Sequence, residues 1–338
     1  MDRAPPGKIG ATDERTDVTS ELSPTTGTTS SDPASRLAAR YGTPADFTPP
    51  TWNPVLDLLL RHHSVRQWLP GEIDEPTLRT VIAAAQSAPS SSNKQVVSVI
   101  AVRDPESRRR LAAVGRQMSS HIVDAPVTLV WLIDYSHGRF LASRARGTVD
   151  ATSGADAGSQ GHGVAGTPDT DLGALDYLDE AMAAAADIGI AAQNAAVAAE
   201  SLGLGTVFLG SIRNDLDEVR AILDVPETVV PFLGLELGHP DPEENAGVKP
   251  RLPMDLFLHH DSYARTGDDG EDDGGDRDAR RADLLTGYDA TLASYYSRYG
   301  SHPRWSAQLL NRLGRRAVER TDRRFLRRIM ERAGFGLH

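Results

Sequence analysis

The sequence predicts a domain in which helices and strands are intermixed, of the α+β or α/β class. Two kinds of segment point to this class. Short apolar runs rich in β-branched residues, typical of buried strands, lie at about 96–102, 127–133, 206–210 and 229–237. Segments with apolar residues at helical spacing lie between and after them. With 338 residues, of which 39% are hydrophobic, the chain can bury at least one full core.

The helices are predicted from apolar spacing and from residues that start or stop a helix. In the segment 75–87, Leu78 and Val81 recur at helical spacing, with Asp74 placed as N-cap and Pro76 in the first turn. Further helices are expected from about 105, after a cap at Asn214 or Asp215, and at about 282–299 and 304–333.

One helix is expected to be long and central. Residues 172–202 are small and apolar on nearly every face, and Gly203 and Gly205 follow as stop signals. This pattern predicts a helix that is buried on all sides.

Three segments fall outside the expected core. Residues 1–50 are rich in Pro, Ser, Thr, Gly and charge and show no apolar period, so we expect a disordered N-terminal tail. Segments at about 144–171 and 266–282 have a similar composition and are expected to be loop insertions. The chain therefore divides into a tail, 1–50, and one domain, 51–338, with two insertions.

Composition excludes several chemistries. Cysteine is absent, which excludes disulfides, thiolate metal sites and cysteine nucleophiles, so a redox function would need a cofactor. The ten histidines show no metal-ligand spacing, and we expect no metal. No long apolar run and no leader pattern is visible, so we expect a cytoplasmic protein that does not contact membranes.

Charge argues against a polyanionic partner. The formal net charge is −11, and residues 267–278 hold seven acids against one arginine. Residues 304–338 carry ten arginines against three acids, but apolar residues occupy another face and no stacking aromatics are interleaved. We therefore expect a solvated amphipathic surface there and no nucleic-acid binding.

The sequence GHGVAG at 161–166 formally matches the dinucleotide fingerprint GxGxxG. That motif requires a buried strand before it and a helix after it. Here a loop-like Ser/Gly/Asp segment precedes it and Thr-Pro follows, so we interpret it as a chance match.

Three polar clusters remain. RHHSVR at 61–66 combines potential cations with a hydroxyl, and an exposed basic turn is its simplest alternative. SAPSSSNKQ at 87–95 lies between two pieces of core, and its side chains could do no more than cap the preceding helix. KPRLP at 249–253 places two cations on a proline-framed loop, which suits a phosphate or is only a rigid surface loop.

The order of these clusters resembles the nitroreductase superfamily of FMN enzymes. The first two turns are followed by LGSIR at 209–213, after a strand, and then by KPRLP. Within the superfamily, the pattern is similar to that of oxygen-insensitive NADPH nitroreductases and NADPH:flavin oxidoreductases. The resemblance runs from about Leu58 to the C-terminal region and includes AAQNAAVAAESLGLGTVFLGSIRND, PFLGLELGHP, HHDSY and YDATLASYY.

The resemblance implies an α+β, nitroreductase-like fold. Its expected features are a central mixed or antiparallel sheet surrounded by helices, a long buried central helix, and a C-terminal extension exchanged between subunits. It also implies a homodimer with two FMN molecules at the interface, each bound by both chains.

The first turn is expected to hold the FMN phosphate and the N1/O2 edge of the flavin. The resemblance places His62, His63 and Ser64 near the phosphate and ribityl chain, and Arg66 at the flavin edge. A cation there would stabilise the negative charge that develops when the ring accepts hydride, so Arg66 is expected to be catalytic. The family commonly has arginine at the position of His63, which makes part of the positive charge titratable here.

The remaining site residues are also implied by the resemblance. The serine-rich turn is expected to contact the flavin of the second subunit through Ser90, Ser91, Ser92, Asn93 and Gln95. Gln117 corresponds to a flavin-edge glutamine if one residue of spacing is absorbed. The backbone of Leu209, Gly210 and Ser211 is expected to face the ring near N5, and Lys249 and Arg251 are expected to form the phosphate clamp.

These assignments predict a ping-pong NAD(P)H oxidoreductase that reduces nitroaromatics, quinones or free flavins. NADPH is the expected donor, with Arg304 in the loop 298–305 as the candidate for its 2′-phosphate. One alternative is an FMN-binding relative with other chemistry, such as reductive dehalogenation or flavin cleavage. The other is a non-catalytic protein that binds flavin or serves as an interaction surface.

Overall fold

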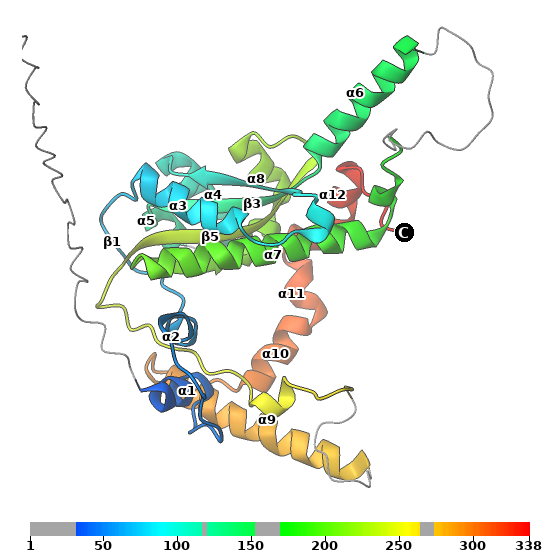
Figure 1. Cartoon of the computed structure of the whole chain (residues 1–338). Coiled ribbons are helices and arrows are strands. Elements are labelled where there is room, and N and C mark those ends of the chain that lie inside the picture. The colour runs from blue at the N-terminus through cyan, green and yellow to red at the C-terminus, as the bar shows by residue number, and fades with distance from the viewer. Residues whose placement is uncertain (1–31, 117–119, 153–169, 264–273) are drawn as a thin grey trace, which may run out of the picture.

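The computed structural model describes residues 32–116, 120–152, 170–263 and 274–338 (Figure 1). At its centre is an antiparallel sheet of five strands, in which β5 pairs with β1, β3 and β4, and β3 pairs with β2. The strands are β1 (Trp68–Leu69), β2 (Val97–Val102), β3 (Val127–Asp134), β4 (Gly205–Leu209) and β5 (Val229–Pro240). The predicted α+β fold and the four predicted strands are confirmed, and the short β1 is an addition.

Helices cover both faces of the sheet. α7 (Leu178–Ser201) lies along one face and contacts α3 (Glu75–Gln86) and strands β2 to β5 (Figure 1). On the other side, α4 (Pro105–Gly115) contacts α5 (His121–Asp124) and α8 (Leu216–Leu223). The remaining helices are α1 (Pro33–Tyr41), α2 (Pro54–Arg61), α6 (Ser136–Thr152), α9 (Gly274–Ser297), α10 (Trp305–Leu313), α11 (Arg315–Glu319) and α12 (Leu326–Arg332).

Side-chain caps fix where the helices begin. Asp74 accepts from the backbone N–H of Thr77 at 2.7 Å, as the sequence predicts for α3. Of the two cap candidates for α8, Asp215 is the cap and accepts from the Glu218 N–H at 3.0 Å. Asn214 is buried instead, and its amide donates to the Val114 carbonyl at 3.2 Å.

The predicted N-terminal tail is wrong for its second part. Residues 33–41 form α1, capped by Asp32, with Leu37 buried. The composition of 1–50 hid this helix because one short amphipathic turn contributes few apolar residues to a polar segment. Residues 1–31 lie outside the described part of the chain.

Both predicted insertions are partly helical. The first, 144–171, is helical up to Thr152 because α6 continues into it. The second, 266–282, is helical from Gly274 because α9 begins there and not at about 282. The segments 153–169, which contains the GxGxxG match, and 264–273 lie outside the described residues.

The prediction that the central helix is buried on all sides is wrong within one chain. One face of α7 is buried, with alanines at 184, 192 and 195 against the sheet and α3. The opposite face is open, with Met182 63% exposed and Ile190 42% exposed. Among the described residues, α7 is the one helix long and apolar enough to cross a membrane, a test that core helices also pass.

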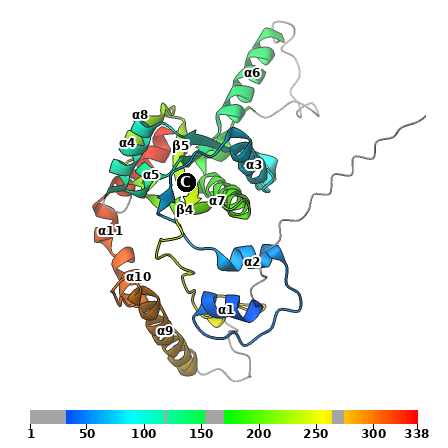
Figure 2. The ribbon, with the colours of Figure 1, turned by 90° about the vertical axis from the view of Figure 1, so that its left-hand side faces the viewer.

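The C-terminal helices leave the sheet and then return. α9 lies apart from the sheet, α10 and α11 lead back toward it, as Figures 1 and 2 show, and α12 places Ile329 and Met330 in the core. The single helix expected at 304–333 is therefore broken into three, with a 3₁₀ turn at Asp322–Phe325. Gly314 follows α10 in an extended conformation, which accounts for the first break.

Candidate functional site

Two of the predicted turns line one cavity of about 400 Å³ between α2, α7 and β4. His62 from the first turn and Arg251 from the KPRLP loop both face it, although 189 residues separate them in the chain. The lining residues are Arg40, Leu58, Leu59, His62, Gln193, Val197, Glu200, Phe208 and Arg251. The fold thus brings together two residues that the sequence assigned to one phosphate site.

Glu200 fixes the imidazole of His62. Its Oε1 lies 2.6 Å from His62 Nδ1 and accepts from Thr206 Oγ1 at 2.6 Å. Because a carboxylate beside Nδ1 favours a proton there, the other ring nitrogen, Nε2, remains for a ligand. Both contacts are made by the same oxygen of the Glu200 carboxylate.

The rest of the first turn is held by β4 and by a carboxylate that follows β5. Ser64 forms a parallel bridge with Thr206, and Val65 is buried. Glu244 accepts from the backbone N–H of Arg66 at 3.0 Å and from that of Gln67 at 3.2 Å. The Arg66 side chain is exposed, so the turn is fixed by its backbone while the predicted catalytic guanidinium stays accessible.

His63 lies outside the cavity. Its ring is exposed, and its Nδ1 lies 3.3 Å from the carbonyl oxygen of Arg61.

The KPRLP loop is backed by α9. Lys249 Nζ lies 3.0 Å from Tyr296 Oη and 5.2 Å from the centre of its ring, and Tyr288 donates to the Pro250 carbonyl at 2.9 Å. Arg251 donates to the Lys249 carbonyl at 3.0 Å and is exposed. Both predicted clamp cations are therefore on a loop braced by tyrosines.

The Leu209–Ser211 turn follows β4 and is held from the C-terminal segment. Arg323 donates to the Gly210 carbonyl at 2.7 Å and to Asn214 Oδ1 at 2.9 Å. Burial lowers the pKa of the Arg323 guanidinium, as does its neighbour Arg312. The turn directly follows β4, and β4 forms the bridge to Ser64 through Thr206, so the fold connects these two predicted segments.

The serine-rich turn is built on α7 and has a strained backbone. Ser91 donates to Asp187 through its N–H at 3.0 Å and its hydroxyl at 2.9 Å. Ser92, Asn93 and Gln95 have φ of 53°, 55° and 52°, in the left-handed region that costs non-glycine residues about 1 kcal/mol or more each. The predicted residues are thus presented by a turn whose conformation the buried Asp187 carboxylate maintains.

The serine-rich turn and the phosphate cavity are far apart in one chain. Asp187 and Glu200 both lie on α7, thirteen residues apart, which corresponds to about 20 Å along a helix. The structure therefore divides the predicted residues into two groups. One is the serine-rich turn at Asp187, and the other is the phosphate cavity at Glu200, near the C-terminal end of α7.

Besides His63, Gln117 and Arg304 lie in neither group. Gln117 lies outside the described residues. Arg304 is exposed just before α10. Burial opposes ionisation of the nearby Asp289, but two hydrogen bonds from Ser306 and, to a smaller extent, Arg304 lower its pKa.

Sequence reasoning missed the residues that support the site. They are Arg40, Asp187, Glu200, Glu244, Tyr296 and Arg323. The one available signal was a charged residue, Asp187 or Glu200, within an otherwise apolar helix, since a buried charge is normally paired.

A second buried acid lies behind the first turn. Glu236 on β5 is fully buried, and its Oε2 lies 2.7 Å from His121 Nδ1. Burial raises the pKa of Glu236 above its ordinary value, and the hydrogen bond from His121 opposes the shift. Trp68 donates to the His121 carbonyl at 3.2 Å, which connects this pair to β1.

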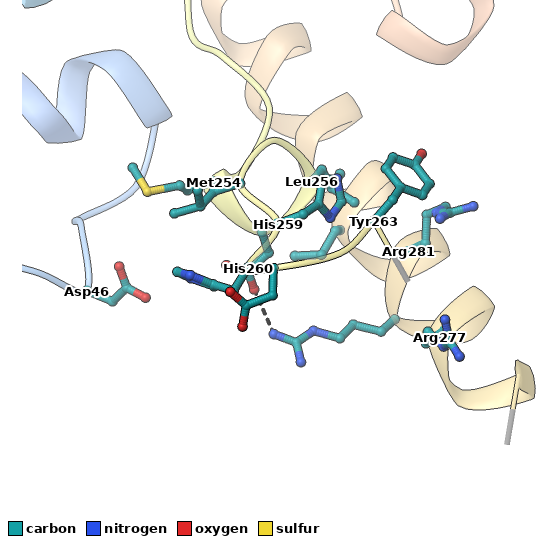
Figure 3. Close-up of a pocket in the computed structure, with 13 residues that line it drawn as sticks. Asp46, Met254, Leu256, His259, His260, Tyr263, Arg277 and Arg281 are labelled. Atoms are coloured by element: carbon teal, nitrogen blue, oxygen red, sulfur yellow. Dashed lines mark hydrogen bonds and ion pairs between the residues drawn. The ribbon is translucent and has the colours of Figure 1, made fainter. Parts of the chain in front are cut away.

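A second cavity, of about 590 Å³, is lined by none of the predicted residues (Figure 3). It lies between Asp46, the segment 254–263 and the first half of α9. Arginines and aspartates line it together, and Arg280 pairs with Asp255 at 2.7 Å. Its opposing charges give no preference for an anion.

Comparison with known proteins agrees with the fold and with the order of the turns. The Nitroreductase family profile matches residues 59–131 and 174–239, and the profile of the Nitroreductase family, C-terminal domain, matches residues 249–338. The chain therefore belongs to the nitroreductase family, a class of oxidoreductases.

Individual relatives cover most of the chain. An NADPH-dependent oxidoreductase of Staphylococcus aureus strain MSSA476 is 31% identical over 266 residues, 78% of this chain and 92% of that protein. Among solved structures, Bacillus megaterium NfrA1 has a TM-score of 0.67 at 27% identity and covers 84% of this chain and 100% of its own. The NADPH:FMN oxidoreductase of Vibrio harveyi, in complex with NAD+, has a TM-score of 0.60 at 28% identity and covers 85% and 100%.

Proposed function

We propose that the protein is an FMN-dependent oxidoreductase that takes hydride from NADPH and reduces nitroaromatics, quinones or free flavins. The observation that carries the proposal is the cavity that joins His62 to Arg251 in a chain of the nitroreductase family. The relatives named for NADPH and for FMN support the same choice of cofactor and donor.

The donors around the cavity fit a phosphate group. Arg40, Arg251 and His62 all line the cavity. The single carboxylate there, that of Glu200, is bonded to His62 and Thr206. Paired cations suit a dianion, and a guanidinium binds phosphate oxygens through several N–H groups at once.

When bound, FMN supplies the ring that accepts and then gives up hydride. Arg66 would stabilise the negative charge at the N1/O2 edge, and Glu244 holds the backbone that carries it. The Leu209–Ser211 turn offers main-chain groups toward the ring, with Gly210 fixed by Arg323. We expect donor and acceptor to bind in turn, so that steady-state kinetics are ping-pong.

The proposal includes a homodimer. Glu200, which lines the phosphate cavity, is about 20 Å along α7 from Asp187, which holds the serine-rich turn, and this separation supports a second copy as the source of Ser90 to Gln95. The open face of α7 and an apolar groove of about 390 Å³ beside α12 are available to that copy. Leu310 and Leu313 on α10 are 71% and 73% exposed, which supports an extension that packs on the partner.

The dimer can be tested through α7. Met182→Asp places a charge on its open apolar face, and sedimentation should show monomers where the wild type is dimeric. Arg79→Gln, at the exposed ion pair with Glu75 on α3, is the control outside this face and should stay dimeric. A monomeric wild type, or a Met182→Asp variant as dimeric as the wild type, would contradict this assignment.

A titration without oxygen tests the activity. Purified protein reconstituted with FMN should be yellow, bleach on addition of NADPH, and recover its colour when a nitroaromatic is added. Colour that neither NADPH nor NADH bleaches would favour an FMN protein with other chemistry. Protein that takes up no FMN would favour a non-catalytic role.

The proposal also includes a cytoplasmic location, no membrane or nucleic-acid partner and no metal. Cell fractionation tests the location, binding assays test the partners, and metal analysis tests the absence of a metal.

A further inference from the structure

α1 lies before the matched family segments, which begin at residue 59. It is nevertheless firmly docked. Leu37 is 3% exposed, and Arg36 forms an ion pair with Asp57 of α2 at 2.7 Å. Gly42 ends the helix with φ of 74°, and a Cβ there would clash with the side chain of Thr291 of α9. α1 is therefore packed between α2 and α9, as Figure 2 shows.

The last turn of α1 carries a buried cation that joins both phosphate segments. Arg40 is 7% exposed, and it donates to the carbonyls of Leu60 and His62 at 2.8 Å each and to that of Lys249 at 3.1 Å. The Arg40 carbonyl in turn accepts from the Arg251 N–H at 2.8 Å. One residue thus fixes the separation of the turn at 61–66 and the loop at 249–253.

Arg40 also adds positive charge to the cavity. Its hydrogen bonds in this structure go to neutral carbonyl oxygens, so they satisfy its donors without cancelling its charge. Burial and the neighbouring Arg251 lower the pKa of Arg40, and Tyr41 and Glu200 oppose the shift. Two guanidinium groups beside one carboxylate leave an excess of positive charge, which a bound phosphate would neutralise.

We propose that α1 is a cofactor strap in which Arg40 is a positioning residue for the flavin phosphate, holding Arg251 and the His62 turn together and supplying a third cation. This inference rests on the proposed FMN site. It assigns a binding role to a helix that the matched family segments do not include.

The test compares FMN with riboflavin, which has the same ring and ribityl chain but no phosphate. Full-length apoprotein is titrated with each flavin, and quenching of flavin fluorescence gives the dissociation constant. Arg40→Met should raise the Kd for FMN by about tenfold or more and leave that for riboflavin within about twofold. The control, Arg36→Met on the same helix, loses only an ion pair outside the cavity and should change neither value by more than about twofold.

A purely structural role predicts a different pattern. If Arg40→Met weakened FMN and riboflavin equally, or changed neither, the phosphate assignment would be wrong. Arg40→Lys covers the case in which Arg40→Met fails to fold, because lysine keeps the charge but cannot span the three carbonyls. Arg40→Lys should weaken the binding of FMN and not that of riboflavin. Wild-type FMN affinity in Arg40→Lys would overturn the proposed role of α1.

The proposed function can fail separately. If wild-type protein bound no FMN, a thermal shift with inorganic phosphate would still decide the role of Arg40. Stabilisation by phosphate in the wild type and in Arg36→Met, but not in the Arg40 variants, would support the anion site. An equal shift in all of these proteins, or in none, would refute it.

Discussion

The pairing of Ser91 with Asp187 offers a quantitative test of how the serine-rich turn is held. Asp187→Ala removes the acceptor of the Ser91 N–H and hydroxyl, at 3.0 and 2.9 Å. A hydrogen bond to a charged group contributes about 1.5–3 kcal/mol, and release of the left-handed backbone at three nearby residues offsets part of the loss. We expect the free energy of unfolding to fall by about 2–4 kcal/mol.

A double-mutant cycle isolates the side-chain interaction. Ser91→Ala removes the hydroxyl and keeps the N–H, so the coupling between Ser91→Ala and Asp187→Ala reports the hydroxyl–carboxylate bond. We expect about 1.5–3 kcal/mol from urea unfolding of the apoprotein at one fixed protein concentration. Asp179→Ala, at the exposed start of the same helix, should cost less than about 1 kcal/mol. A coupling energy near zero would refute the view that this carboxylate maintains the turn.

Further predictions concern charge and pH. Because burial raises the folded-state pKa of Glu236, its contribution to stability is complete below about 4.5, its ordinary pKa, and is lost as the pH rises through the raised value. Glu236→Gln should therefore gain stability relative to the wild type as the pH rises, and a difference in melting temperature independent of pH would contradict this. Arg66→Gln should slow flavin reduction by about tenfold or more while FMN affinity changes less; the opposite ranking would exclude Arg66 from the flavin edge. Arg304→Ala should lower kcat/KM for NADPH and not for NADH, whereas equal effects would exclude a contact with the 2′-phosphate.

Local signals predicted most of the fold. Val127–Asp134 is a strand whose β-branched run is buried on both faces of the sheet, whereas Val97–Val102, at the sheet edge, is a β-rich run that is mostly half-buried. Asp74 caps α3 because aspartate before a proline-containing first turn is a strong start signal. α1 has the same start signal, Asp32 followed by Pro33. The polar composition of residues 1–50 nevertheless led to the prediction of a disordered tail.

The sequence by itself determined four of the strands, the long apolar helix and the order of the polar turns, because these depend on residues close together in the chain. It could not reveal that Arg40 meets Lys249, or that Asp187 and Glu200 hold two different turns, because such contacts join residues up to 209 positions apart. It also could not show that α7 is open on one face, since small apolar residues suit either a core or an interface. Packing alone decided which buried charges have partners, and those partners give the candidate site its shape.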